Sequence, residues 1–160
     1  MGSPGKNKLI HLVVAKLTAD LELFFTAAKN AHKASIDEEN QPDNKYDTLA
    51  LEASYVAQGQ ANRAQEIRRS IEIYNHLELL QTATIRMSSL VTLEDDNGDQ
   101  KRIFIGPAEG GLRVSTESGD VMVITPASPL GNALIGRTID ELVEVKTGGT
   151  STKYHIIGVV

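Results

Sequence analysis

The sequence lacks several residue types on which particular classes of protein depend. It contains no cysteine and no tryptophan, and only three phenylalanines and four tyrosines among its 160 residues. The absence of cysteine excludes disulfides and thiolate metal sites, and the four histidines are too far apart in the sequence to suggest a zinc site. So few aromatic side chains argue against a large cofactor pocket or a ladder that stacks single-stranded bases.

Excess positive charge and long apolar runs are missing as well. The net charge of −5 gives no long-range attraction to a phosphate backbone, so nucleic acid is not the expected direct partner. No run of about 18 apolar residues is present that could span a bilayer. The apolar stretch from Leu9 to Ala15 is interrupted by His11 and has no cleavage site, which indicates a helix rather than a signal peptide. We therefore expect a cytoplasmic protein without a membrane segment.

The first half of the sequence contains two stretches in which apolar residues recur at alternating spacings of three and four. This spacing is typical of the seam of a coiled coil. Between the stretches, residues 35–43 include Pro42 and many polar residues, which predicts a turn and an antiparallel hairpin. One half of a helical bundle, or a dimer whose seam is intermolecular, would have the same pattern. The seam positions are Ile10, Val14, Leu17, Leu21, Phe24, Ala28 and Ala31, followed by Tyr46, Ala50, Ala53, Ala57, Gln60, Ala64, Ile67, Ile71 and Tyr74.

Past Met87 the period of the pattern changes to two, and valine, isoleucine, threonine and glycine dominate. We expect the Asn97-Gly98 and Gly148-Gly149 pairs to form tight turns, with positive φ angles in the first pair. Residues 128–136 predict one short helix, because a serine precedes a proline suited to its first turn and Gly136 follows. This half is thus predicted to be a small α+β domain, with strands at 89–94, 101–105, 111–115, 121–125, 142–146 and 154–160.

The residues of this half resemble a known family. The stretches 121–126, 128–136, 142–145 and 154–159 are similar to the C-terminal domain of the bacterial Gre transcript-cleavage factors, GreA and GreB. The resemblance implies an FKBP-like antiparallel sheet domain with one short helix at 89–160. It also implies that residues 1–88 are an antiparallel coiled-coil finger with an acidic tip, a match supported by Gln58, Gln60 and Arg63 in the second helix.

The resemblance further implies a partner and a role. A Gre-like factor is a cytoplasmic monomer that docks on bacterial RNA polymerase and inserts its finger into the secondary channel, near the 3′ end of the nascent RNA. Its tip carboxylates help to hold a catalytic Mg²⁺, and the polymerase then hydrolyses its own backtracked transcript. Such a protein is an accessory factor rather than an enzyme, it has no cofactor of its own, and DNA binding is associated with its family.

The predicted tip concentrates negative charge. Six acids lie between residues 36 and 52, with Lys45 as the only base among them. Mg²⁺ accepts one or two carboxylates and keeps its other positions for water and phosphate, so acids on a slender tip suit a partial site. The same acids also suit an N-cap, a first helical turn and a solvated surface. The residues alone leave both interpretations open.

The family resemblance selects particular acids. The family tip has the sequence Asp-Leu-Ser-Glu-Asn-Ala-Glu-Tyr, and aligning its tyrosine with Tyr46 places Glu39 at the first acid and Pro42 at the second. We therefore expect Glu39 and Asp43 to bind the shared Mg²⁺, with Asp37 and Glu38 as alternates. Because a proline stands where the family has an acid, the alternative is a regulator that binds the secondary channel without stimulating cleavage.

Overall fold

A computed structural model of the chain describes residues 4–39 and 47–160, without the side chains of Pro4, Ser35 and residues 37–39 and 47–54. The chain divides into two compact units. One consists of Ala15–Glu72, and the other combines Met1–Val14 with Ile73–Val160. None of the described helices is long and apolar enough to cross a membrane.

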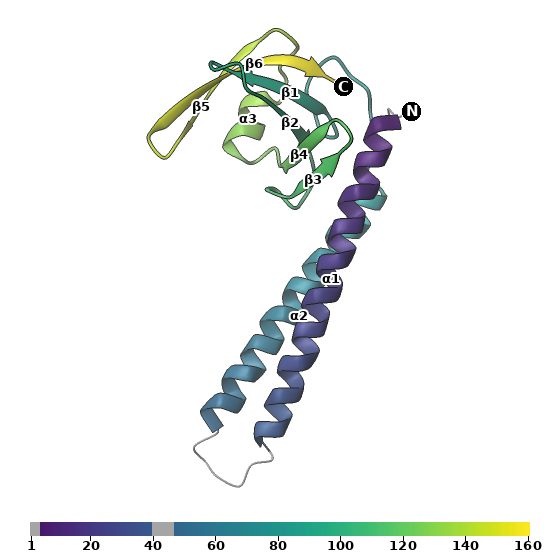
Figure 1. The fold of residues 1–160 in the computed structure, drawn as a ribbon, viewed down its shortest axis with the longest axis vertical. Helices are drawn as coiled ribbons and strands as arrows, with labels where there is room; N and C mark the ends of the chain where they lie inside the picture. Colours follow the sequence, from purple (N-terminus) through teal and green to yellow (C-terminus); the bar gives the residue numbers. More distant parts are fainter. Residues whose placement is uncertain (1–3, 40–46) are drawn as a thin grey trace. The chain divides into compact units, whose positions relative to one another are not determined.

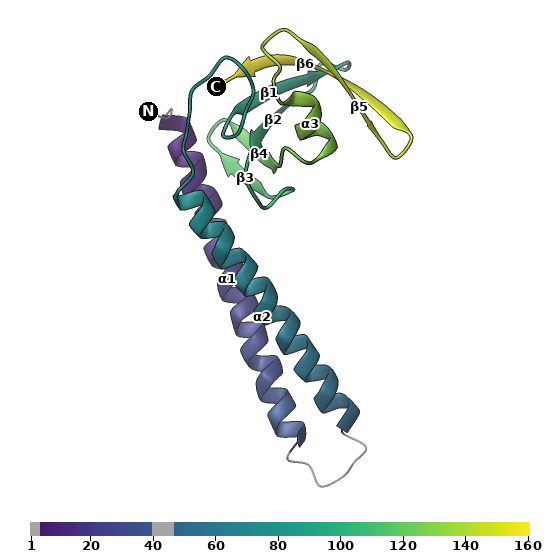
Figure 2. The same cartoon turned by 180° about the vertical axis from the view of Figure 1, so that it is seen from behind.

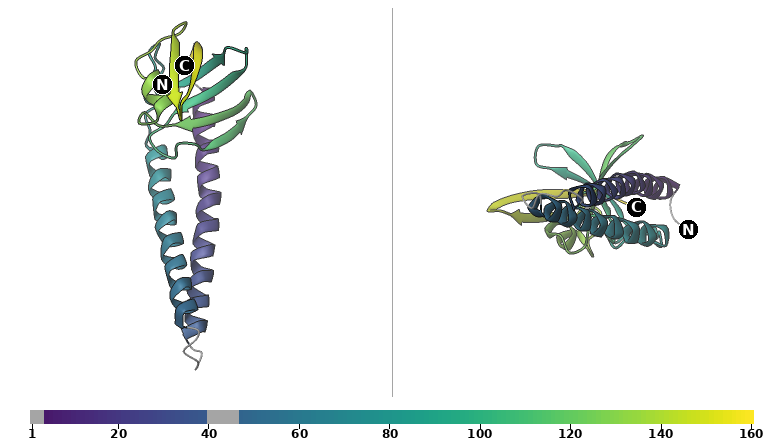
Figure 3. Two further views of the ribbon diagram at one scale, coloured as in Figure 1. Left: turned by 90° about the vertical axis from the view of Figure 1, so that its left-hand side faces the viewer. Right: turned by 90° about the horizontal axis from the view of Figure 1, so that it is seen from below.

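The unit Ala15–Glu72 is built from two long helices. Helix α1 (Pro4–Glu39) and helix α2 (Asp47–Asn75) lie side by side and run in opposite directions through this unit (Figures 1 and 3). Leu17, Ala64 and Ile67 are buried between them, with exposed fractions of 1%, 4% and 0%. The remaining seam positions described in this unit are half-buried: Leu21, Phe24, Ala28, Ala31, Ala57, Gln60 and Ile71.

The structure differs from the prediction at both ends of α1. The helix continues to Glu39, past the expected turn start at residue 35, because no glycine or proline interrupts it before Pro42. Near its beginning, Leu9 and Val13 are buried more deeply than the predicted Ile10 and Val14. This end of α1 belongs to the unit that contains the sheet, so it needs a broader apolar face than a two-helix seam.

The other unit contains a six-stranded sheet in the order β3-β4-β2-β1-β6-β5. Its strands are β1 (Leu90–Asp95), β2 (Gln100–Ile105), β3 (Arg113–Thr116), β4 (Gly119–Ile124), β5 (Leu142–Thr147) and β6 (Thr150–Val159). The α+β class and the six predicted strands are confirmed. The expectation of a wholly antiparallel sheet is wrong, because β4 inserts between β3 and β2 and pairs with β2 in parallel.

The two predicted tight turns have different backbones. Gly148 and Gly149 both have positive φ angles, of 57° and 80°, as a two-residue turn requires. In the β1–β2 turn only Gly98 is positive, at 82°, so the expectation for Asn97 is wrong. The Asp95 carboxylate stabilises this turn instead, because its Oδ1 accepts hydrogen bonds from the backbone N–H groups of Asn97 and Asp99 at 2.9 and 3.0 Å.

The short helix α3 (Pro129–Leu134) begins as predicted and lies next to the sheet (Figure 2). The Ser128 hydroxyl accepts a hydrogen bond from the Gly131 N–H at 3.0 Å, which caps the helix. A side chain at position 131 would place its Cβ 2.0 Å from the Thr125 carbonyl oxygen, so only glycine fits there. Buried aliphatic residues form the core between helix and sheet: Ile85, Val91, Leu93, Ile103, Ile105, Ile124, Leu134, Val143 and Ile156.

Candidate functional site

The predicted tip acids fall at the end of α1 and in the segment that follows it. Asp37, Glu38 and Glu39 are the last three residues of α1. Their side chains, and the whole of Asp43, lie outside the described residues. The pairing of Glu39 with Asp43 therefore stays a prediction.

The tip carboxylates can be judged as ligands for Mg²⁺, the ion that the resemblance implies. Carboxylate oxygens are hard ligands of the kind that Mg²⁺ prefers, and two of them suit an ion whose other ligands come from a partner. Among the described side chains, which do not include those of Asp37, Glu38 and Glu39, no group of three or more histidine or acidic residues is placed to hold a metal ion. A Mg²⁺ ion shared between the tip acids and a partner therefore stays a prediction.

Above the tip, Arg63 links the two helices. Its guanidinium carbon lies 5.9 Å from the centroid of the Phe24 ring, a cation–π contact from α2 to α1. The same guanidinium makes an ion pair with Glu66 at 3.2 Å. Gln58 donates a hydrogen bond to Asn62 along α2 at 3.0 Å, and Gln60 is half-buried in the seam. Arg63 thus has a structural role in holding the hairpin together.

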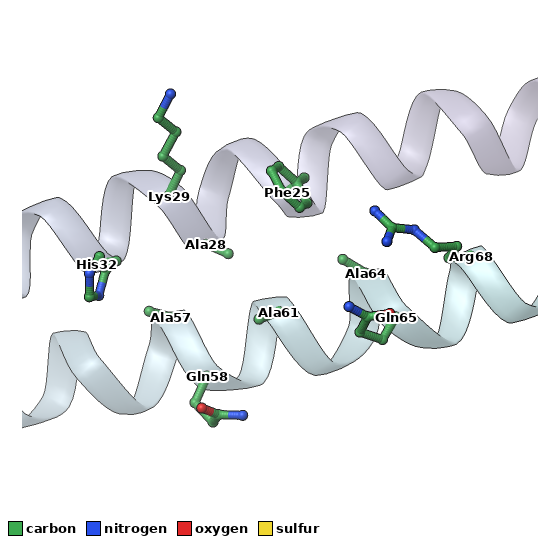
Figure 4. A pocket seen from close by; sticks show the side chains of 10 residues that line it. All are labelled: Phe25, Ala28, Lys29, His32, Ala57, Gln58, Ala61, Ala64, Gln65 and Arg68. Carbon is green, nitrogen blue, oxygen red and sulfur yellow. The ribbon is translucent and has the colours of Figure 1, made fainter.

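A hollow of about 550 Å³ lies along one face of the helix pair, and we call it the hairpin groove (Figure 4). From α1 it is lined by four residues at helical spacings of three and four, and from α2 by six residues on one face. Figure 4 shows the alanine side chains pointing into the space between the helices and the Phe25 ring beside them on α1. The lining residues are Phe25, Ala28, Lys29, His32, Ala57, Gln58, Ala61, Ala64, Gln65 and Arg68.

Two buried polar side chains hold the helix ends within the sheet-containing unit. Lys6 is fully buried, and its Nζ donates a hydrogen bond to the Leu80 carbonyl oxygen at 2.6 Å. Burial lowers the pKa of Lys6 below the usual value for lysine. Tyr74 is 1% exposed, and its hydroxyl donates to the Ala108 carbonyl oxygen at 2.6 Å. These contacts fix the start of α1 and the end of α2 in this unit.

The region after α3 exposes apolar side chains. Ile135, Ile139 and Leu142 are 39%, 51% and 73% exposed although they lie within eight residues of one another. Glu141 stabilises the loop between them, because its carboxylate accepts a hydrogen bond from the Thr138 backbone N–H at 2.5 Å. That hydrogen bond is the main cause of a lowered pKa for Glu141.

Sequence reasoning did not identify the hairpin groove or these polar anchors. Phe25 follows the predicted seam residue Phe24, and nothing in a heptad pattern distinguishes a solvent-facing phenylalanine that lines a hollow. The partners of Lys6 and Tyr74 are 74 and 34 residues away in the sequence. Of the exposed apolar residues after α3, Leu142 had a weak sequence signal. It alternates with Val143 at the start of β5, and Val143 is buried.

An antiparallel helix pair followed by a six-stranded α+β domain defines a two-part protein with no metal cluster among its described residues. The family model described as "Transcription elongation factor, GreA/GreB, C-term" matches residues 80–160. The chain belongs to this GreA/GreB family, as a divergent member, and the resemblance stated from the sequence is confirmed.

Individual relatives are similar at low identity. Transcription elongation factor GreA of Rickettsia canadensis (strain McKiel) is 24% identical over 155 residues, which cover 92% of each chain. GreA of Beijerinckia indica subsp. indica is 29% identical over 112 residues, which cover 69% of this chain and 66% of the relative. Among solved structures, GreA factor homolog 1 of Thermus thermophilus is 22% identical with a TM-score of 0.39, covering 92% of this chain and 94% of that one.

Proposed function

We propose that this protein binds bacterial RNA polymerase at its secondary channel and stimulates the cleavage of backtracked transcripts. The observation that carries the proposal is the match of residues 80–160 to the GreA/GreB family model. The full-length similarity to factors named for transcription elongation supports a role of the whole chain rather than of one domain. The protein acts in the cytoplasm as a monomeric accessory factor, and the polymerase supplies the catalytic centre.

The tip carboxylates carry the chemical part of the proposal. Glu39 and Asp43 would hold an Mg²⁺ shared with the polymerase, with Asp37 and Glu38 as alternates. The ion supplies charge stabilisation for phosphodiester hydrolysis and a more acidic water. The hairpin contributes reach and stiffness, because the seam around Leu17, Ala64 and Ile67 keeps the two helices together. The factor needs no pocket of its own for the RNA.

A second function is favoured by one feature of the sequence. Pro42 stands at the position of the family's second acid, so the tip departs from the pattern that provides two carboxylates. A hairpin that enters the channel with an incomplete carboxylate pair would bind the polymerase and alter elongation without stimulating cleavage. This regulator is the alternative that the experiment must separate from a cleavage factor.

The test is transcript cleavage in a stalled, backtracked bacterial elongation complex. We expect the wild-type protein to shorten the nascent RNA, and the Glu39→Ala/Asp43→Ala variant to shorten it no faster than the complex without factor. A matched control, Asp96→Ala/Asp99→Ala, removes the same charge from two exposed positions of the β1–β2 turn and should retain full activity. Binding of each protein to core polymerase is measured in parallel.

The outcomes separate the alternatives. If the wild type binds the polymerase but does not shorten the transcript, the regulator replaces the cleavage factor. If the tip variant cleaves as fast as the control, the assignment of Glu39 and Asp43 is wrong. Absence of binding by the wild type would contradict both functions.

A further inference from the structure

The hairpin groove combines an apolar floor with a rim that carries the positive charges of Lys29 and Arg68. Lys29, His32 and Arg68 are the ionisable side chains that line it, and no acidic residue does so. Figure 4 shows His32 at one end of the hollow and Arg68 at the other, with Arg68 extending towards Phe25. This local positive charge is notable in a chain whose net charge is −5.

These three side chains have no polar partner within the described structure. No hydrogen bond or ion pair joins Lys29, His32 or Arg68 to another residue among those described. Glu66, an acid on the same stretch of α2, is paired with Arg63 instead. A smaller neighbouring hollow shares Phe25 and Arg68 and is also lined by Glu22, an acid that offsets the charge of Arg68 but not that of Lys29.

The two adjacent phenylalanines of α1 have different surroundings. Phe24 is half-buried in the seam and contacts Arg63, whereas Phe25 is 55% exposed and lines the groove. The ring of Phe25 and the alanine methyl groups form the apolar part of the groove, which the apolar side chains of a partner could cover. Ala28, Ala61 and Ala64 leave room beside the ring because their side chains are short.

We propose that the hairpin groove is a docking site for an acidic amphipathic segment of the polymerase polypeptide. The apolar side chains of that segment would cover Phe25 and the alanine floor, and its carboxylates would pair with Lys29 and Arg68. The inference rests on the proposed function, because it assigns to the polymerase a contact with the side of the hairpin, away from the tip.

A polypeptide fits this groove better than RNA does. The lining offers only the phenyl ring of Phe25 and the smaller imidazole of His32, too few rings to stack a run of successive bases. The floor consists of methyl groups that cannot donate hydrogen bonds to phosphates. An amphipathic helix, in contrast, presents an apolar strip flanked by charges at the spacing of helix turns, which suits a groove between two helices.

The test compares two pairs of substitutions at adjacent positions. Phe25→Ala/Arg68→Glu removes the exposed ring and reverses the charge in the groove. Leu23→Ala/Arg69→Glu makes the same kind of change just outside it, since Leu23 is 69% exposed and neither residue lines the groove. We expect the groove pair to weaken binding to core RNA polymerase about tenfold or more, and the control pair to change it less than about twofold. Thermal melting checks that both variants are folded.

A photo-crosslinker at the rim identifies what covers the groove. Gln65→benzoylphenylalanine is placed in the factor, which is then bound to a backtracked elongation complex and irradiated. We expect a crosslink to a polymerase polypeptide, mapped to a segment in which acidic residues flank apolar ones. A crosslink to RNA, or to a basic segment, would overturn the proposal.

Failure of this inference is distinguishable from failure of the proposed function. If the wild type binds the polymerase and the two pairs of substitutions weaken binding equally, the groove is not the docking site, but the channel-binding function stands. If the wild type does not bind the polymerase at all, both fall together.

Discussion

Tyr74 shows how one side chain can connect a helix to a distant loop. Its hydroxyl donates to the Ala108 carbonyl oxygen, and the ring is almost fully buried. The pKa of Tyr74 is raised, first because burial disfavours the phenolate and then because Glu109 adds negative charge nearby. A Cβ at position 106 would lie only 2.3 Å from the Tyr74 hydroxyl oxygen, so Gly106 is what allows the tyrosine to reach this loop.

Substitution of Tyr74 tests this connection. Tyr74→Phe should lower the free energy of unfolding by about 1 kcal/mol at neutral pH, because the Ala108 carbonyl loses its donor. The exposed Tyr55, at 67%, provides the control Tyr55→Phe, which should leave stability nearly unchanged. Urea unfolding of the three proteins gives the comparison.

The direction in which the stability contributed by Tyr74 changes with pH follows from its raised pKa. The raised pKa keeps Tyr74 protonated in the folded state above pH 10, where the unfolded chain loses this proton. The stabilising contribution is therefore complete below pH 10 and decreases as the pH rises further. Tyr74→Phe should lose stability less steeply than the wild type above pH 10. Equal slopes would contradict the assignment.

For single residues, the sequence predicted the helix or strand in which a residue lies more often than its tertiary contacts. Ser128 was expected to precede the short helix, and its hydroxyl caps α3 because capping depends on neighbours in the chain. Tyr74 was expected only as a seam residue. Its hydrogen bond to Ala108 depends on the tertiary packing of β2 and the following loop, which no local pattern encodes.

The helix pair is the element whose rigidity the proposed function requires. A two-helix unit has few buried side chains, so each fully buried residue contributes a large share of its stability. Ile67 is 0% exposed in the seam of α2, whereas Ile73, on the same helix, is 44% exposed. The two isoleucines therefore form a matched pair for substitution.

Ile67→Ala should lower the free energy of unfolding by about 2–5 kcal/mol, because it leaves a cavity between the helices. Ile73→Ala should cost about 0.5 kcal/mol, since most of the removed surface is already accessible to water. Circular dichroism at 222 nm, followed through thermal unfolding, measures both. A loss of stability for Ile73→Ala as large as that for Ile67→Ala would show that the seam is not where the stability resides.

The periodicity of apolar residues predicted the helices and strands well, but it did not predict which strands pair. The three-and-four spacing located α1, α2 and the seam residues from Leu17 to Ala31, because burial of one helical face imposes that spacing. The period of two located all six strands. It does not encode which strands are neighbours, so the parallel pairing of Arg102 with Val121 and Phe104 with Val123 was not foreseen.

At the scale of the whole molecule, the functional interpretation depends on family membership together with charge. The GreA/GreB match covers residues 80–160, and six acids cluster outside it, between residues 36 and 52. Composition could exclude a thiolate metal site and a membrane segment, but it could not identify RNA polymerase. That partner follows from the resemblance, because a docking surface is recognised by a second molecule that the sequence does not contain.

The position of the candidate site along the chain could be predicted from the sequence, but the arrangement of its carboxylates could not. Pro42 and the polar cluster predicted a turn at residues 35–43, whereas α1 extends to Glu39 and the rest of the predicted turn lies outside the described residues. Which carboxylates converge on one ion depends on the path of the chain through residues 40–46 and on the partner. Glu39 and Asp43 therefore remain predictions made from alignment with the family tip.

The most direct test of a shared Mg²⁺ site at the tip is the Mg²⁺ dependence of transcript cleavage in a backtracked elongation complex saturated with the factor. If the tip carboxylates help to hold the ion, the wild-type protein should lower the Mg²⁺ concentration needed for half-maximal cleavage. The Glu39→Ala/Asp43→Ala variant should return that concentration to the value of the complex without factor. A wild-type curve that coincides with the factor-free curve, although the factor is bound, would contradict a role of the tip carboxylates in holding the ion.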